Sequence, residues 1–172
     1  MSAAAILDAA SPERARELLS ECCGATRFVD HMLAARPFAS DRVLHEAAER
    51  IWAACDRDDI LEAFSHHPRI GADLGKLRER FGGARAALST AEQAGAVGAS
   101  EEVLLALQEA NARYEARFGY IFIVCASGKT AEEMLGFLEA RLSNAPANEL
   151  VVAAAEQAKI TRLRLERLAD RA

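Results

Sequence analysis

The segment His66-His67-Pro68-Arg69-Ile70-Gly71 joins two imidazoles to a rigid proline and a flexible glycine. Pro68 must end any helix before it, so His67 is expected at a helix C-terminus. The helix dipole there favours the charged imidazolium, which suits a group that gives or holds a proton near neutral pH. An isolated segment of this kind is more often a pair of surface histidines, so the pattern alone is weak.

A second candidate lies at Ser89-Thr90-Ala91-Glu92, which has the spacing of a helix capping box. Capping explains Ser89 and Glu92 completely without any chemistry. A carboxylate in a first helical turn is also held ionised by the dipole, and it can orient an imidazole or accept a substrate N–H. The adjacent Gln93 offers donors and acceptors for an imide-like ring.

The third candidate is an arginine near the C-terminus. With about 100° per residue, Arg164 lies about 40° from Ile160 on the apolar stripe of the last helix, whereas Arg162 lies about 200° away. A guanidinium directed at a core is costly unless it is paired or lines a pocket for an anion. Two alternatives stay open for Arg164: an ion pair with Glu156, on the same stripe, or a substrate clamp.

Two weaker patterns favour structural roles. Ser127-Gly128-Lys129-Thr130 lacks the upstream glycine and strand of a phosphate-binding loop, so a loop and helix cap are predicted. Cys22, Cys23 and His31 do not have the spacing of metal ligands, and no CxxC motif occurs. The four cysteines are therefore expected to be mostly buried thiols, and no metal site is predicted.

Helix start and stop signals follow one another with short gaps and place these candidates. The predicted helices are 11–23, 40–54, 58–67, one from 89, 100–119, 130–143 and one capped by Asn148 that reaches about residue 168. The apolar run 121–125 is expected to be extended or helical and buried, since a single strand has no partner. We predict an all-α, single-domain bundle of about seven to eight helices over residues 1–172.

Composition is consistent with this fold: 51% of the residues are hydrophobic, only 6% are aromatic, and glycine and proline are sparse. The net charge of −5 comes from acidic and basic residues mixed along the chain, so no nucleic-acid partner is expected. No apolar run is long enough for a membrane span, and the opening MSAAAILDAA lacks the features of a signal peptide. We expect a cytoplasmic protein without a membrane partner.

The order of these motifs resembles the family of 2-oxo-4-hydroxy-4-carboxy-5-ureidoimidazoline (OHCU) decarboxylases. The resemblance spans about residues 10–168. Its motifs are the segment 66–71, Ser89-x-x-Glu92-Gln93, Tyr114-x-x-x-Phe118-Gly119-Tyr120-x-Phe122-Ile123, Arg141-Leu142-x-Asn144, Glu149 and Lys159-Ile160-x-x-Leu163-Arg164-Leu165. One departure is Ile121, where some family members have proline; this alters rigidity rather than identity.

The resemblance implies a cofactor-free, all-helical enzyme, commonly a homodimer, that converts OHCU to (S)-allantoin and CO2 in urate degradation. It assigns His67, Glu92 and Arg164 to catalysis. Substrate binding is assigned to Pro68, Ser89, Gln93 and the backbone of Ile121, Phe122 and Ile123. The competing hypothesis is a helical binding or scaffold module in which His67 is exposed, Glu92 only caps a helix, and Arg164 only pairs with Glu156.

Overall fold

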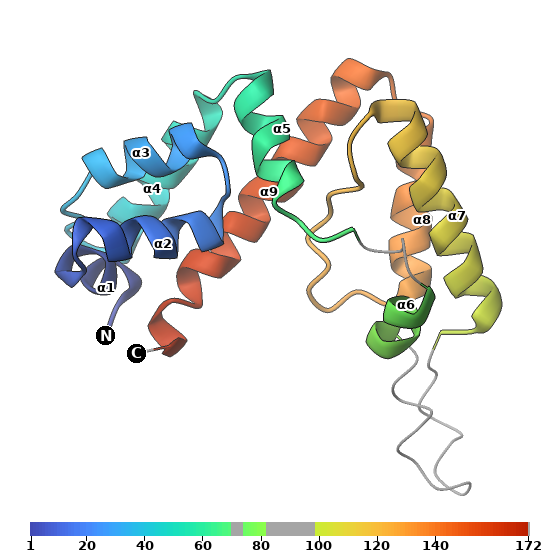
Figure 1. The fold of residues 1–172 in the computed structure, drawn as a ribbon, viewed down its shortest axis with the longest axis horizontal. Coiled ribbons are helices and arrows are strands. Elements are labelled where there is room, and N and C mark those ends of the chain that lie inside the picture. Colours follow the sequence, from blue (N-terminus) through green and yellow to red (C-terminus); the bar gives the residue numbers. More distant parts are fainter. Residues whose placement is uncertain (70–73, 82–98, 172) are drawn as a thin grey trace, which may run out of the picture. The chain divides into compact units, whose positions relative to one another are not determined.

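The computed structural model describes residues 1–69, 74–81 and 99–171, which form helices and connecting segments without a β-strand (Figure 1). These residues hold nine α-helices and a short 3-10 helix, so the all-α prediction is confirmed with slightly more helices than expected. They fall into two compact units. The first unit comprises Met1–His67, Ile123–Cys125 and Val152–Ala172, and the second comprises Pro68–Phe122 and Ala126–Val151.

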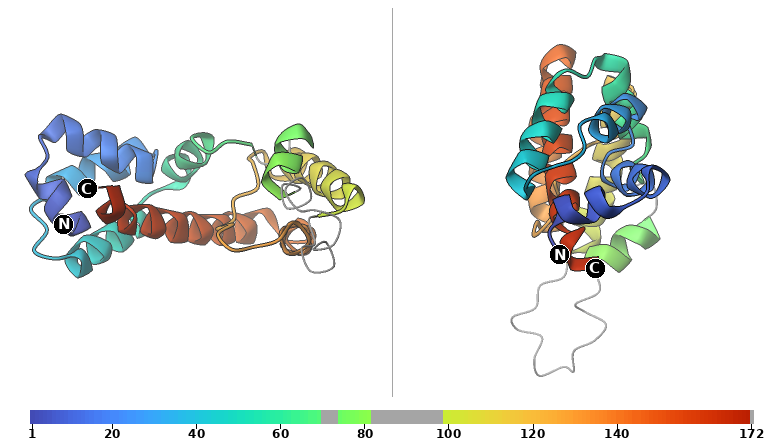
Figure 2. Two further views of the ribbon diagram at one scale, coloured as in Figure 1. Left: turned by 90° about the horizontal axis from the view of Figure 1, so that it is seen from below. Right: turned by 90° about the vertical axis from the view of Figure 1, so that its left-hand side faces the viewer.

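The first unit is built from five N-terminal helices and most of the last helix. They are α1 (Ala3–Ala9), α2 (Pro12–Cys22), α3 (Thr26–Ala34), α4 (Asp41–Ala53), α5 (Arg57–Ser65) and α9 (Pro146–Glu166), followed by the 3-10 helix η1 (Ala169–Arg171). Helix α3 packs against α2, α4 and α5, and the first and last elements lie close together (Figure 2). Its core is aliphatic and aromatic, with Leu19, Phe28, Met32, Leu44 and Leu165 fully buried.

The second unit contains α6 (Leu74–Phe81), α7 (Glu101–Phe118), α8 (Ala131–Leu142) and the first residues of α9. Helices α7 and α8 pack side by side (Figure 1), with Leu104, Leu107, Met134 and Leu138 buried. Segment 121–126 is neither helix nor strand and is largely buried, as expected for this apolar run.

Helix ends follow the local signals of the sequence. Ser11 and Ser40 cap α2 and α4, Ser100 caps α7, and Thr130 forms a capping box at α8. Helix α7 ends at Gly119, whose φ of 80° lies in the left-handed region that glycine adopts without a steric penalty. These predicted boundaries are confirmed.

Two predicted boundaries need correction. Helix α5 is capped by Asp56, through a capping box with Asp59, rather than by Asp58 or Asp59. Helix α9 begins at Pro146 instead of at an Asn148 cap, because proline has no N–H to lose in a first helical turn and its φ already suits the helix. The last helix is therefore longer at its N-terminus than the sequence indicated.

The buried line of α9 also differs from the predicted stripe. Ile160 is only half-buried, whereas the residues spaced four apart at 149, 153, 157, 161 and 165 are all buried. This line carries three polar side chains, Glu149, Gln157 and Thr161. A buried polar group is costly unless it is hydrogen-bonded, so each of them must have partners inside the fold.

Candidate functional site

His67 lies directly after the C-terminal end of α5 and is half-buried. Its backbone N–H donates to the carbonyl of Phe64 at 3.1 Å, which continues the last turn of the helix. Its ring Nε2 lies 2.5 Å from Oε1 of Gln157, a residue 90 positions away on α9. The predicted placement at a helix end is confirmed, and the imidazole has a specific partner that a surface histidine would lack.

A buried polar chain continues from Gln157 into the core of the first unit. The amide Nε2 of Gln157 donates to Oγ1 of Thr161 at 3.1 Å, one helical turn further along α9. Thr161 in turn forms a hydrogen bond with the thiol of Cys23, which follows α2. Burial raises the pKa of the Cys23 thiol to about 11, and this keeps the sulfur protonated at neutral pH.

The protonation of His67 differs from the expectation. Burial lowers the pKa of its imidazole from the usual value of 6.5. The hydrogen bond to Gln157 opposes this shift, while the positive charges of Arg164 and His66 add to it. The helix C-terminus therefore does not make His67 an imidazolium at neutral pH; desolvation outweighs the dipole, and the ring is neutral.

The neighbouring His66 packs tightly against the turn between α2 and α3. A Cβ atom added to Gly24 would clash with Cβ and Cγ of His66, and the position of that Cβ is fixed by the backbone. Glycine at this position therefore allows the end of α5 to approach the turn. This contact is one of the constraints that set the position of His67 at the next residue.

Arg164 projects from α9 toward the C-terminal end of α2. Its Nη1 donates to the backbone carbonyls of Glu21 at 3.0 Å and Cys22 at 3.4 Å. A cation is favourable there, since the last carbonyls of a helix have no partner within it. Glu156 instead accepts from the backbone N–H of Cys125 and pairs with Lys159, so the anticipated pair between Arg164 and Glu156 is not found in the described part of the chain.

The contrast between the two arginines agrees with the helical angles. Arg164 is half-buried, whereas Arg162 is exposed and pairs with Glu49 and Glu166, each at 3.2 Å. Arg164 also lines a cavity of about 430 Å³ in the first unit. The residues around this cavity are Ser20, Glu21, Cys22, His66, Arg164, Arg167 and Leu168. Part of Arg164 is thus accessible beside its contacts with α2.

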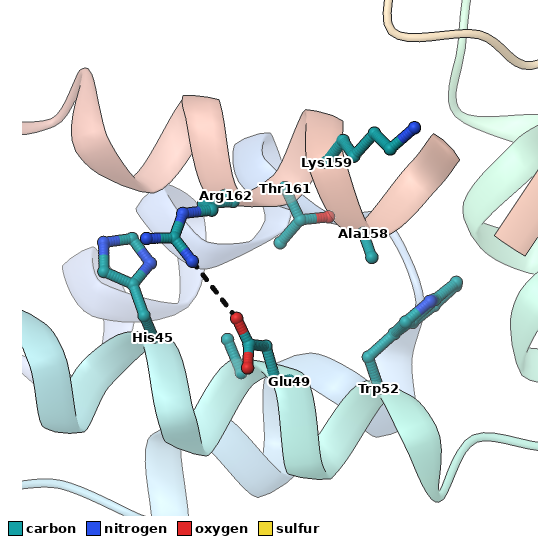
Figure 3. Close-up of a pocket in the computed structure, with 8 residues that line it drawn as sticks. His45, Glu49, Trp52, Ala158, Lys159, Thr161 and Arg162 are labelled. Carbon is teal, nitrogen blue, oxygen red and sulfur yellow. Dashed lines mark hydrogen bonds and ion pairs between the residues drawn. The ribbon is translucent and has the colours of Figure 1, made fainter. Parts of the chain in front are cut away.

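A second cavity, of about 340 Å³, lies between α4 and α9 (Figure 3). Its lining residues are His45, Ala48, Glu49, Trp52, Ala158, Lys159, Thr161 and Arg162. The ion pair between Glu49 and Arg162 crosses it, as the dashed line in Figure 3 shows. None of the predicted site residues lines this cavity, so we do not assign it to the candidate site.

The second unit holds a separate buried polar network around Glu149. The carboxylate accepts from the Tyr114 hydroxyl through Oε1, from Nε of Arg141 at 2.8 Å, and from Nδ2 of Asn144 at 2.7 Å through Oε2. The Arg141 guanidinium also lies over the Phe122 ring, 4.6 Å from its centroid. Both carboxylate oxygens are used, so these residues of the family motif have a structural explanation.

The structure distributes the predicted substrate-binding residues between its units. Pro68 is exposed, Ile121 is half-buried and Phe122 is buried, all three in the second unit, while Ile123 is buried in the first. The ring of Phe122 is packed against Arg141. Ser89, Glu92 and Gln93 lie outside the described residues, so their roles stay predictions.

Sequence reasoning did not identify Gln157 or Thr161 as part of the site. The available signal was their spacing of four on the inward side of the last helix, together with Glu149 eight residues earlier. Polar side chains on a buried helical line require partners. That pattern indicates a polar network but does not reveal which distant residue completes it.

The described residues contain no cluster of three or more histidine, cysteine, aspartate or glutamate side chains that could hold a metal ion. None of the helices in the described ranges has the length and apolar character needed to cross a bilayer.

Comparison with proteins of known sequence identifies relatives in urate degradation. The chain is 40% identical over 149 residues to a bifunctional uric acid degradation protein of Arabidopsis thaliana. This alignment covers 86% of the chain and 45% of that protein. It is 32% identical over 136 residues to the bifunctional uric acid degradation protein PucL of Bacillus subtilis. This alignment covers 77% of the chain and 25% of PucL. The chain therefore spans less than half the length of these two relatives.

Among solved structures, one match covers nearly the whole length of both proteins. A crystal structure of OHCU decarboxylase determined in the presence of (S)-allantoin aligns with 94% of this chain and 99% of its own, at a TM-score of 0.70 and 35% identity. An (S)-allantoin synthase, 19% identical with a TM-score of 0.66, shares the fold over 96% of this chain and 53% of its own. The sequence profile of the OHCU decarboxylase family matches residues 8–166, and the chain belongs to that family.

Proposed function

We propose that this chain catalyses the decarboxylation of OHCU to (S)-allantoin and CO2, a step of urate degradation. The observation that carries this proposal is the alignment of nearly the whole chain with nearly the whole of a solved OHCU decarboxylase, at 35% identity. A shorter match supports it: the chain is 46% identical over 56 residues to the 2-oxo-4-hydroxy-4-carboxy-5-ureidoimidazoline decarboxylase of Amia calva, which covers 33% of this chain and 32% of that protein.

The chemistry of the substrate explains why we propose a reaction without a cofactor. The carbon that bears the carboxylate is bonded to the carbon of a C=N group. When the bond to CO2 breaks, its electron pair forms a new carbon–carbon double bond and the imine pair moves to nitrogen, which is protonated. The former imine carbon then takes a proton, and the hydroxyl loses its proton to become a carbonyl. Because the nitrogen and the carbon each gain a proton and the hydroxyl loses one, one proton is consumed overall.

The neutral state of His67 suits a hydrogen-bond acceptor in this sequence. One ring nitrogen is held by Gln157, and we propose that the other accepts a hydrogen bond from the substrate hydroxyl and then its proton. We assign Arg164 to an anionic or carbonyl edge of the substrate, because this half-buried arginine lines a cavity. Glu92 stays in the proposed catalytic set, as the family resemblance implies, and Ser89, Gln93, Pro68 and the backbone of residues 121–123 would hold the ureido group and the ring.

We further propose that the protein is a cytoplasmic homodimer that acts on this small molecule and has no nucleic-acid or membrane partner. The family resemblance supports the dimer, and the mixed distribution of charge supports the absence of a nucleic-acid partner. Light scattering coupled to size-exclusion chromatography measures the mass of the assembly directly. A single mass of one chain at all concentrations would contradict the dimer.

The decisive experiment generates OHCU from urate in situ and follows its decay and the optical activity of the allantoin formed. We expect faster decay than in buffer and predominantly (S)-allantoin, because a protein site supplies the proton from one face. His67→Asn should lower the rate by roughly 10²- to 10⁴-fold with an unchanged helical circular dichroism spectrum, whereas His66→Asn costs much less. Racemic product at the spontaneous rate would favour the scaffold alternative.

A further inference from the structure

Gln157 is a fully buried polar side chain on the helix that carries Arg164, with a relative exposure of 0%. Both ends of its amide are engaged: Oε1 lies 2.5 Å from Nε2 of His67, and Nε2 donates to Oγ1 of Thr161 at 3.1 Å. An amide in a fully buried position costs free energy unless its hydrogen bonds are made, and a hydrogen bond is directional. Gln157 therefore imposes an orientation on the groups that it contacts.

We propose that Gln157 is a positioning residue that holds His67 as the Nε2–H tautomer and leaves Nδ1 as the acceptor for the reaction. A carbonyl oxygen can only accept a hydrogen bond, so the ring nitrogen that faces it must carry the proton. A neutral imidazole has one N–H, and its other nitrogen then has a lone pair. The role of Nδ1 as the acceptor for the substrate hydroxyl rests on the proposed function.

Thr161 sets the direction of the Gln157 amide. If the amide turned over, its N–H would face His67 and would require the opposite tautomer. In the structure the amide nitrogen of Gln157 faces the Thr161 hydroxyl, whose Oγ1 accepts from it at 3.1 Å. The donors therefore run in one direction from His67 through Gln157 to Thr161.

The surroundings of His67 keep this arrangement neutral. Among the described residues, Arg164 and His66 act on its charge besides Gln157, and both disfavour a second proton on the ring. A doubly protonated ring would donate from both nitrogens, and Nδ1 would no longer accept. The tautomer is thus defined by Gln157, while the neutral state is maintained by burial and by the neighbouring positive charge.

The test combines a spectrum without substrate with the kinetics of defined variants. Long-range ¹H–¹⁵N correlation spectra distinguish the two neutral tautomers, and the His67→Asn spectrum identifies the signals of His67. We expect the Nε2–H tautomer in the parent protein. Gln157→Leu, close in volume but without the amide, should give a mixture of tautomers and lower kcat by roughly 10- to 100-fold with a much smaller change in KM.

Three further variants separate positioning from packing. In Gln157→Glu the carboxylate still accepts from Nε2–H, so the tautomer is retained, and its negative charge moves the acidic limb of the kcat profile to higher pH. Thr161→Val keeps the shape but removes the hydroxyl, so we expect a partial loss of tautomer purity and kcat, whereas Thr161→Ser should restore both. Arg162→Lys, on the exposed side of the same helix, is the control and should change neither.

The outcomes are separable from those of the proposed function. An Nδ1–H tautomer in the parent protein, or an unchanged tautomer and kcat in Gln157→Leu, would overturn the positioning role. If the parent protein does not accelerate OHCU decay, the proposed function fails while the spectra still decide the tautomer. Should Gln157→Leu not fold, the parent spectrum and the pair Thr161→Val and Thr161→Ser give the same decision.

Discussion

Helix α9 contributes to two buried polar networks, one in each compact unit, and the two networks end differently. In the second unit, Glu149 is surrounded by Tyr114, Arg141 and Asn144, and both of its carboxylate oxygens are used. In the first unit, the chain through Thr161 and Gln157 ends at the half-buried ring of His67. The network in the second unit is centred on a buried carboxylate, whereas the one in the first unit reaches a half-buried, titratable ring at its end.

We therefore expect the network around Glu149 to stabilise the fold and the network that ends at His67 to serve the proposed reaction. Burial raises the pKa of the Tyr114 hydroxyl far above its usual range, so Tyr114 stays a neutral donor to Glu149, and the Arg141 charge is matched by the carboxylate. The imidazole of His67, with its pKa lowered by burial, is neutral and retains a nitrogen for another partner. Motif residues of one family therefore serve two physical purposes.

The largest expected effect comes from breaking the network around Glu149. Glu149→Ala leaves the buried guanidinium of Arg141 without its counter-charge, and we expect the free energy of unfolding to fall by about 3–5 kcal/mol. Urea denaturation followed by circular dichroism measures this loss. Glu149→Gln, which keeps an acceptor, should lose less. A loss no greater than that of Gln157→Leu would contradict the division between the two networks.

The next effect concerns Arg164, which contacts the end of α2 and also lines a cavity. Arg164→Lys keeps the charge but replaces the planar fork with a single ammonium. We therefore expect kcat/KM to decrease, with a loss of about 1.5–3 kcal/mol in transition-state stabilisation. Arg162→Lys, at the exposed position, should change stability and turnover within about 0.5 kcal/mol. If Arg164→Lys lowers the melting temperature but not the turnover, Arg164 belongs with the structural residues.

A smaller effect is expected where the end of α5 meets the turn after α2. Gly24→Ala places a methyl group against His66, and the backbone must shift to accept it. We expect a loss of about 1–3 kcal/mol in unfolding free energy, together with reduced kcat because His67 moves relative to Gln157. Gly136→Ala is the control, since an added Cβ there meets no atom within 4 Å. Equal effects of the two substitutions would contradict this contact.

The smallest effect is a dependence of stability on pH. Because the folded-state pKa of His67 lies below the unfolded value of 6.5, the unfolded chain binds the proton more readily between these two values. Stability from this group is complete above pH 6.5 and decreases as the pH falls through that window. Urea midpoints between about pH 5 and pH 7.5 should therefore fall less steeply in His67→Asn than in the parent protein. Identical slopes would show that His67 is not desolvated.

The sequence predicted the starts of α2, α4, α7 and α8 because each cap depends on atoms within one turn of the chain, whereas no bounds were predicted for α1, α3 and α6. A serine or threonine oxygen reaches the N–H groups two or three residues ahead, and Gly119 adopts the left-handed backbone that ends α7. Helical angles likewise separated the exposed Arg162 from the half-buried Arg164. Family membership followed from motifs spread over nearly the full chain, and the profile match to residues 8–166 confirms it.

Partners that lie far apart in the sequence were decided by the tertiary structure alone. Local signals placed His67 at a helix end and suggested an imidazolium, but the neutral ring results from burial beside a glutamine 90 residues away. The alternatives for Arg164 included Glu156, yet its guanidinium contacts the carbonyls at the end of α2. Hydrogen-bond partners and desolvation depend on which surfaces pack against each other in the folded chain. A local pattern of residue types does not show which distant segments come into contact.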